Sequence, residues 1–272
     1  MAVNVCVDLM GQPAGEDLPA FLRRTWAPVL GSGLQSGVLL ASDGSVVRLD
    51  DLPSVDTDGV MAPEALAPVA GWTADQNRLA LSIGRTGEVY LFTAGRLLLA
   101  RRGAQWRGFP VEALRESGGF GTSGSHLAMP VKTAVLAALI DASAAHHGAC
   151  IGIVTNAQRV AALQNLVNEH DKWEVPDNRR RAMFGTYSFL HLSRRHRLEL
   201  LSMDGATILD QSGGILAAGA ILRVDGGSPG GGRTAAALAL AKYGVGIKVS
   251  QDGPVTAYAL EADHVVKHFS MG

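Results

Sequence analysis

Cysteine is nearly absent from this sequence, which has only Cys6 and Cys150 among 272 residues. Two thiols so far apart form no disulfide framework of the kind that stabilises small secreted domains. Cys150 lies in a predicted core strand, where a free thiol behaves as a small apolar side chain. Metal-ligand spacings are missing too, because the adjacent His146 and His147 point about 100° apart on a helix.

An excess of charge is also missing, since 24 Lys and Arg residues oppose 25 Asp and Glu residues. Nucleic-acid binders usually carry a strong basic excess, so we expect no nucleic-acid partner. The sequence has no apolar run of about 18 residues and no basic start followed by an apolar stretch. We therefore expect no membrane span and a cytoplasmic protein. The apolar content of 47% is enough for the core of one large or two small domains.

The first 120 residues predict a small, β-rich α+β region. Residues 16–30 have the periodicity of a helix with apolar side chains on one face. Hairpins are predicted over residues 38–49 and 88–100, each around a short turn that contains glycine. Trp106 and Phe109 continue the second hairpin, and we interpret them as core or interface residues rather than a base-stacking platform.

A glycine-rich stretch, residues 117–125, separates this region from the rest of the chain. We place the boundary there, with one domain over residues 1–120 and a second over residues 125–272. In the second domain the expected helices are 130–146, 157–168 with Asn156 as its cap, 193–201 and 234–243. The expected strands are 150–155, 206–210, 215–223, 246–250 and 255–260, and residues 169–181 are expected to form a loop. The turn at 211–214 makes a hairpin, so the sheet must be mixed.

Two neighbouring motifs in the second domain indicate nucleotide binding. Asp204-Gly205-Ala206 stands at a strand start, and a glycine-rich loop over residues 226–232 leads to Arg233 and Thr234 at a helix start. Glycines let backbone N–H groups approach an anion, and a helix N-terminus presents unsatisfied donors with a partial positive charge. Arg233 adds a permanent cation, and Asp204 is suited to hold the metal ion that neutralises the phosphates.

Each motif also has a purely structural interpretation. Asp-Gly before an apolar run is an ordinary turn, and a glycine-rich run is an ordinary surface loop. A third interpretation is a Walker-type phosphate loop, Gly227-x4-Gly232-Arg233-Thr234, with Arg in place of the required Lys. Only 38 residues follow Thr234, too few for the remaining strands of a P-loop NTPase.

The two motifs resemble the nucleotide-binding core of the diadenylate cyclase family, which has the DisA-like fold. The signatures of this family are Asp-Gly-Ala and, further on, Arg-His-Arg followed by Thr or Ala. Asp204-Gly205-Ala206 matches the first signature, and Arg233-Thr234-Ala235 matches the end of the second. A gapless run then leads to Val249-Ser250-Gln251, where the family commonly has Val-Ser-Gln or Val-Ser-Glu. The resemblance covers residues 125–260 and implies an α/β fold with a mixed β-sheet flanked by helices.

The second signature is incomplete, because Gly231 and Gly232 stand where the family has Arg and His. In the family these side chains are implied to hold and polarise the phosphates, which glycine cannot do. The tripeptide Arg195-His196-Arg197 precedes the first signature, and we interpret it as a solvated, basic helix face. The basic clusters Arg101-Arg102 and Arg179-Arg180-Arg181 are expected in solvated loops.

The resemblance therefore implies a nucleotide-binding sensor with a degenerate catalytic motif, whose ligand is a purine nucleotide or dinucleotide. The alternative is an active cyclase that converts ATP to cyclic di-AMP with Mg²⁺ or Mn²⁺, in which Asp204 and Arg233 are catalytic. The β-rich region would transmit the signal, with dimer contact as one route. The expected nucleotide-binding residues are Asp204, which is also the metal ligand, Gly205, Ala206, Gly230, Gly231, Gly232, Arg233, Thr234 and Ser250.

Overall fold

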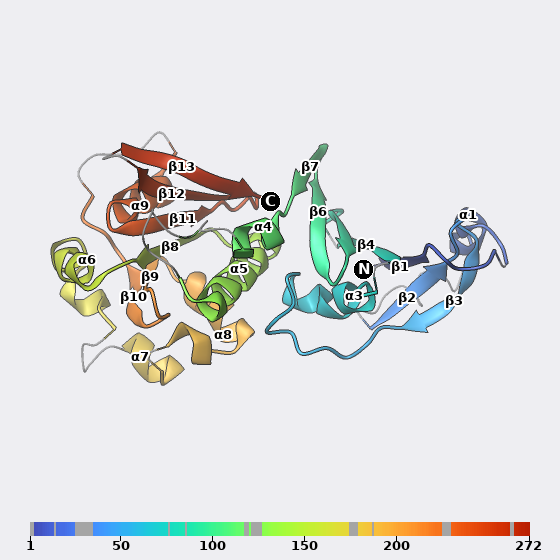
Figure 1. Ribbon diagram of the computed structural model, residues 1–272, viewed down its shortest axis with the longest axis horizontal. Helices are drawn as coiled ribbons and strands as arrows, with labels where there is room; N and C mark the ends of the chain where they lie inside the picture. The colour runs from blue at the N-terminus through green and yellow to red at the C-terminus, as the bar shows by residue number, and fades with distance from the viewer. Residues whose placement is uncertain are drawn as a thin grey trace. The chain divides into compact units, whose positions relative to one another are not determined.

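The computed structural model divides into two units, Met1–Phe109 and Pro110–Gly272, each with its own β-sheet (Figure 1). The structure describes residues 3–13, 15–24, 35–75, 77–84, 86–116, 120, 127–173, 179–186, 188–224, 230–261 and 264–272. Within these residues, no helix combines the length and the apolarity that crossing a bilayer requires.

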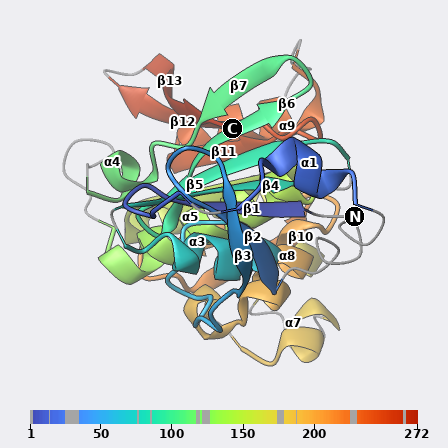
Figure 2. The same cartoon turned by 90° about the vertical axis from the view of Figure 1, so that its right-hand side faces the viewer.

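The first unit is built around a seven-stranded sheet in the order β3-β2-β1-β4-β5-β6-β7. β1 and β2 are parallel, and the other neighbouring pairs are antiparallel. Figure 2 shows β2 and β3 side by side. The strands are β1 (Val3–Asp8), β2 (Ser36–Leu40), β3 (Val46–Asp51), β4 (Arg78–Ile83), β5 (Val89–Thr93), β6 (Arg96–Arg102) and β7 (Gln105–Gly108). The helices are α1 (Leu18–Leu22), the 3-10 turn η1 (Glu64–Leu66) and α3 (Ala67–Trp72).

Both predicted hairpins of this unit are confirmed, as the antiparallel pairs β2–β3 and β5–β6. The predicted helix over residues 16–30 is shorter, because α1 ends at Leu22; residues 25–30 lie outside the described part of the chain. Phe21 of α1 packs with the buried Val38 and Leu40 of β2, which anchors the short helix on the sheet. The sequence interpretation missed β1 and β4, which form the centre of the sheet.

Arg101 and Arg102 lie in β6, so their predicted placement in a solvated loop is wrong. The Nε of Arg102 lies 2.8 Å from Oε1 of Glu88, and the two side chains are only 8% and 9% exposed. A buried charge is tolerated when an opposite charge pairs with it, which explains the position of Arg102. Phe109 is buried as predicted, whereas Trp106 on the edge strand β7 is 51% exposed.

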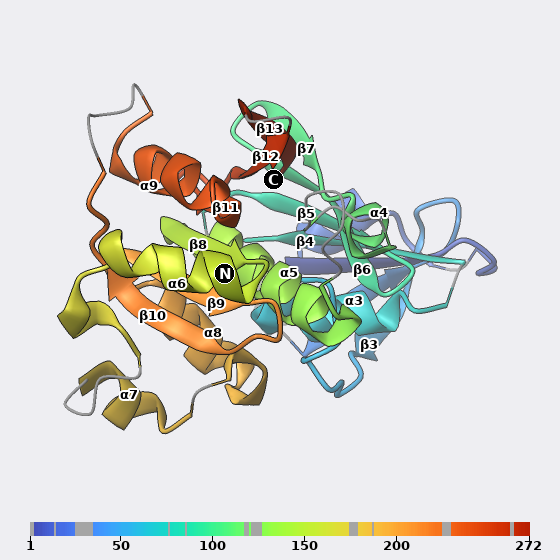
Figure 3. The ribbon, with the colours of Figure 1, turned by 60° about the vertical axis from the view of Figure 1, so that its left-hand side comes forward.

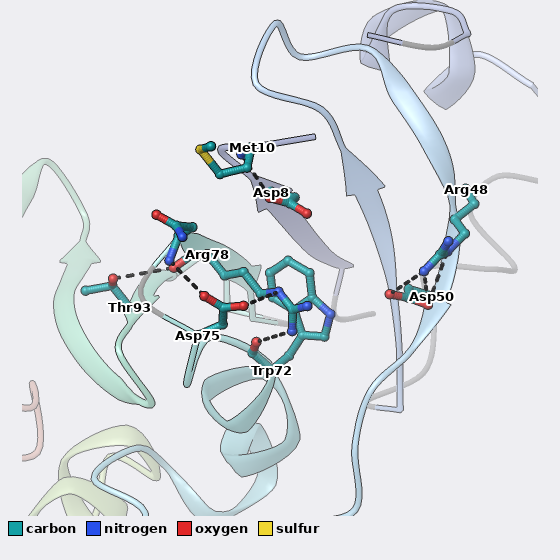
Figure 4. Close-up of polar contacts among 9 residues, drawn as sticks. Asp8, Met10, Arg48, Asp50, Trp72, Asp75, Arg78 and Thr93 are labelled. Atoms are coloured by element: carbon teal, nitrogen blue, oxygen red, sulfur yellow. Dashed lines mark hydrogen bonds and ion pairs between the residues drawn. The ribbon is translucent and has the colours of Figure 1, made fainter. Parts of the chain in front are cut away.

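Arg78 connects α3 to the sheet of the first unit (Figure 4). Its guanidinium lies 4.8 Å from the centroid of the Trp72 ring, and its Nη1 donates to the Trp72 carbonyl at 3.4 Å. Asp75 adds an ion pair, with 3.9 Å between its Oδ2 and the Nε of Arg78. One cation at the start of β4 therefore contacts both the end of α3 and the turn that follows it.

The second unit contains a six-stranded sheet in the order β10-β9-β8-β11-β12-β13. β8 and β9 are parallel and the other neighbouring pairs are antiparallel, so the predicted mixed sheet is confirmed. The strands are β8 (Ala149–Val154), β9 (Ala206–Asp210), β10 (Ile215–Ala220), β11 (Gly244–Val249), β12 (Val255–Glu261) and β13 (His264–Met271). The helices are α4 (Val111–Glu116), α5 (Met129–Ala144), α6 (Ala157–Ala162), α7 (Arg179–Phe184), α8 (Arg194–Leu201) and α9 (Gly232–Ala241). Shorter 3-10 turns are η2 (Leu163–Asn165), η3 (Glu169–Asp171) and η4 (Phe189–His191).

Helices flank both faces of this sheet, as Figure 3 shows for α9 and α8 on either side of β8 and β9. Ala237 and Leu240 of α9 pack with Cys150 and Val154 of β8 in one buried cluster. On the other face, the Thr207 hydroxyl donates to a carbonyl of α8 at 3.4 Å. Successive strand residues point to opposite faces, so helices on both sides require an apolar pattern that does not alternate. The uniformly buried β8 has that pattern.

Most predicted elements of the second unit are present, but α4 was not predicted and β10 ends at Ala220 instead of continuing to residue 223. Further differences concern β13, α6 and a predicted loop. Strand β13 was not predicted, and α6 ends at Ala162 before a 3-10 turn instead of continuing to residue 168. The predicted loop over residues 169–181 contains η3 and the start of α7. The arginines 179–181 therefore lie in a helix, where Arg180 pairs with Asp171. Short helices of this kind depend on tertiary contacts, which periodicity does not show.

The tripeptide Arg195-His196-Arg197 is only partly the solvated face that we predicted. Arg195 and His196 are exposed, but Arg197 is buried and its Nε donates to the Phe189 carbonyl at 3.0 Å. Its Nη2 also donates to the Leu190 carbonyl at 3.0 Å. The interpretation of Arg197 as solvated is therefore wrong, because this guanidinium satisfies the carbonyls of η4.

Candidate functional site

The sheet register brings the predicted motifs to one edge of the second unit. Cys150 of β8 pairs with Ala206 of β9, and Ala149 pairs with Val249 of β11. The start of β8, the start of β9 and the end of β11 therefore lie side by side. Asp204 lies two residues before the start of β9, and α9 packs across β8 and β11.

Arg233, in the first turn of α9, lies directly over the residue that precedes β8. A Cβ on Gly148 would lie 2.6 Å from the Arg233 Cζ, so the guanidinium occupies the space that a side chain would take. Burial raises the pKa of the nearby Cys150 thiol to about 12, and the Arg233 charge opposes part of that rise. Cys150 is thus a neutral, apolar part of the floor beneath this cation.

A cavity of about 620 Å³ opens between the Asp204 turn and the start of α9. This volume falls within the range of small-molecule sites, roughly 300 to 1,000 Å³. The Asp204 turn and the start of α9 contribute the polar groups, and the end of β10 with residues 221–224 contributes apolar side chains. The lining residues are Cys150, Asp204, Gly205, Ala206, Ala220, Ile221, Leu222, Val224, Gly231, Gly232, Arg233, Ala235 and Ala236.

Six of the nine predicted nucleotide-binding residues line this cavity, namely Asp204, Gly205, Ala206, Gly231, Gly232 and Arg233. Gly230, Thr234 and Ser250 are not among its lining residues. The Thr234 hydroxyl donates to the Gly230 carbonyl at 2.7 Å and so closes the first turn of α9. Ser250 follows β11 at the same edge of the sheet, where its N–H donates to Pro254. Residues 226–229 of the glycine-rich loop lie outside the described part of the chain.

Gly205 adopts a conformation that the Asp204 turn requires. Its φ is +104°, and a Cβ there would lie 2.5 Å from the backbone of Gly219. Gly219 also has a positive φ, +57°. The two glycines let the β9 entry pack backbone to backbone against β10, which places the preceding Asp204 at the cavity.

Among the lining residues that the structure describes, the charged side chains are those of Arg233 and Asp204. Among the described residues, neither the Asp204 carboxylate nor the Arg233 guanidinium has a hydrogen-bond or ion-pair partner. The N-cap residue of α9, Gly231, has no side chain to accept from the first N–H groups of the helix. An anion at this point would meet backbone donors, a positive helix end and a guanidinium.

The described residues of the cavity suit a metal ion only if a bound ligand supplies further oxygen atoms to it. The described residues contain no group of three or more His, Cys, Asp or Glu side chains placed to hold a metal. Asp204 is the carboxylate that lines the cavity. Mg²⁺ is usually held by one or two carboxylates together with substrate phosphates and water, which matches a single Asp beside a phosphate site.

Sequence reasoning missed Gly148, Cys150 as a cavity residue, and the apolar side formed by Ile221 and Leu222. Their roles depend on which strands become neighbours. The Walker-type interpretation is not supported, because β10, the strand before the glycine loop, is an antiparallel edge strand. Phosphate loops of that class follow a strand of a parallel sheet.

No family model matches the sequence, and no curated protein matches it. A crystal structure described as a hypothetical membrane spanning protein from Bacillus cereus is similar over 49% of this chain, with 20% identity and a TM-score of 0.35. This chain covers 60% of that protein. A double mutant of DacA from Staphylococcus aureus is similar over 52% of this chain and 86% of its own length, with 14% identity and a TM-score of 0.33. Both structural similarities are weak.

Proposed function

We propose that the second unit is a sensor that binds a purine nucleotide or dinucleotide in the cavity between the Asp204 turn and α9. The observation that carries this proposal is that Asp204 and Arg233 line the same cavity. Neither side chain has a hydrogen-bond or ion-pair partner among the described residues. The cation and the helix N-terminus suit a phosphate. The carboxylate suits a metal ion, Mg²⁺ or Mn²⁺, or a sugar hydroxyl.

The same cavity supports binding better than cyclisation. Gly231 and Gly232 line it and carry no side chain toward the phosphate position. Phosphoryl chemistry depends on positioned charges around the transferring group, and Arg233 is the cation among the lining residues. The second candidate, an active cyclase that makes cyclic di-AMP from ATP, is favoured by the intact Asp204-Gly205-Ala206 sequence.

The binding test is thermal shift and calorimetry of the full chain against ATP, GTP and cyclic di-AMP. A ligand present at ten times its Kd stabilises the protein by about 1.4 kcal/mol, which both methods detect. Arg233→Ala is expected to leave folding stability within about 0.5 kcal/mol and to weaken binding by about 1.5 to 3 kcal/mol. Arg195→Ala, at an exposed arginine outside the cavity, is the matched control. No stabilisation of the wild type by any of these compounds at millimolar concentration would remove the proposal.

A separate assay distinguishes the sensor from the cyclase. Incubation with ATP and Mn²⁺ is expected to give no cyclic dinucleotide above background. Product that forms with the wild type and is lost in Asp204→Asn would establish the cyclase instead. Gly231→Arg combined with Gly232→His is expected to restore at most part of an activity, because such groups act as a unit.

A further inference from the structure

Ile221 marks the point where the chain leaves the sheet and becomes the apolar side of the cavity. β10 ends at Ala220, and Ile221 lines the cavity with a residue exposure of 54%. Its N–H donates to the Asp171 Oδ2 at 3.1 Å, and its carbonyl accepts from the Asn168 Nδ2 at 3.4 Å. Two side chains of one turn thus supply the partners that a neighbouring strand would have given.

The same turn continues along the residues after Ile221. Val167 and Leu222 form an antiparallel bridge, and the Arg223 N–H donates to the Leu166 carbonyl at 3.0 Å. The Nε of Arg223 donates to the Asn168 Oδ1 at 3.1 Å, so both ends of the Asn168 amide are used. Residues 166–171 therefore hold residues 221–223 from the side away from the sheet.

Asp171 also connects this turn to α7. Its Oδ1 lies 3.1 Å from the Arg180 Nη1, and its side chain is only 13% exposed. The Arg180 Nε lies 3.2 Å from the position that a Cβ on Gly219 would take, and the Asp204 carbonyl oxygen lies 3.0 Å from that same position. The Asp171 carboxylate thus contacts both the backbone of Ile221, which lines the cavity, and Arg180 of α7.

From these contacts we infer that Asn168 and Asp171 are positioning residues that fix the cavity wall at Ile221 and so set ligand affinity without touching the ligand. The inference rests on the proposed function of the same cavity. Backbone contacts hold Leu222 and Arg223, whereas the partners of the Ile221 N–H and carbonyl are the side chains of Asp171 and Asn168. If this segment is already ordered before binding, less conformational entropy is lost when the ligand binds, and the affinity is higher.

The test uses the full chain, with cyclic di-AMP and ATP as the probes. Asp171→Ala removes the acceptor of the Ile221 N–H. Asp171→Asn keeps one oxygen for that N–H and places a neutral NH2 group opposite Arg180, so it loses the ion pair. Glu169→Ala is the matched control, because Glu169 is in the same turn and pairs with Lys172. Amide hydrogen exchange at Ile221 measures how often its hydrogen bond to Asp171 opens, and calorimetry measures the affinity for the probes.

In Asp171→Ala we expect exchange at Ile221 to accelerate and the Kd of the bound probe to rise roughly tenfold. In Asp171→Asn we expect the exchange rate at Ile221 and the Kd of the probe to be close to those of the wild type. In Glu169→Ala we expect neither quantity to change. Unchanged exchange in Asp171→Ala would overturn the assignment of the contact, and faster exchange with unchanged Kd would overturn the positioning role alone. A wild type that binds neither of these probes nor GTP overturns the proposed function and this inference together. The exchange data then show separately whether the contact between Asp171 and Ile221 exists.

Discussion

Two glycines shape the candidate site through the side chains they lack, and they do so in different ways. At Gly148 the backbone φ lies outside the left-handed region, and the missing Cβ leaves room for the flexible end of Arg233. At Gly205 the φ is left-handed and the neighbouring atoms are backbone, which cannot move aside. A methyl group should therefore displace the Arg233 side chain at Gly148 and strain the fold at Gly205.

We predict that Gly148→Ala weakens nucleotide binding while leaving the free energy of unfolding within about 1 kcal/mol. Gly205→Ala should instead destabilise the protein by about 1 to 3 kcal/mol, the usual cost of a strained backbone conformation. Urea unfolding and calorimetry measure the two effects. Gly59→Ala, where a methyl group meets nothing within 4 Å, is the control. Wild-type affinity in Gly148→Ala would show that the position of Arg233 over Gly148 does not matter for binding.

At the scale of elements, a buried ion pair joins α5 to α8 beneath the sheet of the second unit. The Arg194 Nη2 donates to the Asp141 Oδ1 at 3.0 Å, and the Nε donates to the other carboxylate oxygen. The two side chains are 1% and 3% exposed. The two hydrogen bonds between the guanidinium and the carboxylate offset much of the free-energy cost of burying the two charges. Removing one partner leaves the other charge buried and unpaired, which destabilises the fold.

Arg194→Ala is accordingly predicted to lower the free energy of unfolding by about 3 to 5 kcal/mol. The double substitution Asp141→Leu with Arg194→Met should recover most of this loss, because apolar side chains of similar volume need no charge partner. Denaturant midpoints of the single and double variants provide the measurement. Arg195→Ala, an exposed neighbour paired with Glu199, should change stability by less than about 1 kcal/mol. A mild effect of Arg194→Ala would mean that water reaches the pair.

For the whole molecule, each unit contains one buried thiol. Burial raises the pKa of Cys6 and of Cys150 from the ordinary thiol value of 9.0 to about 12. Both thiols are therefore protonated at neutral pH and react slowly with alkylating reagents until the unit around them opens. Because the folded pKa is the higher one, the stability linked to each thiol is complete below pH 9 and is lost as the pH rises toward 12.

We predict that unfolding free energy falls between pH 8 and pH 10.5 by roughly 2 kcal/mol more in the wild type than in Cys150→Ala. Urea unfolding at the two pH values measures this difference, and the comparison cancels the packing change that the substitution itself causes. Cys6→Ala gives the equivalent test for the first unit. An identical pH dependence in wild type and variant would mean that Cys150 ionises in the folded protein as it does in the unfolded chain.

Local sequence patterns predicted many of the helices and strands of the second unit. A nearly continuous apolar face with Pro130 in the first turn predicted α5, and the apolar run at residues 150–155 predicted β8. The Gly-containing turn predicted the β9–β10 hairpin. These signals act over a few residues, so the sequence shows them directly. β13 lacks so clear a pattern, and its strand form depends on its pairing with β12. β1 does alternate, with Val3, Val5 and Val7 at every second position, and the sequence interpretation missed that signal.

The sequence by itself determined where the Asp204 turn and the α9 start lie along the chain, and that Gly231 and Gly232 leave Arg233 alone. Only the tertiary structure decided which groups meet. Sheet register placed Gly148 beneath Arg233, and a contact between residues 50 positions apart joined Asp171 to Ile221. Burial of an arginine likewise depends on distant partners, which is why Arg197 was misjudged. Turn and helix preferences are local energies, whereas a site is a set of long-range contacts.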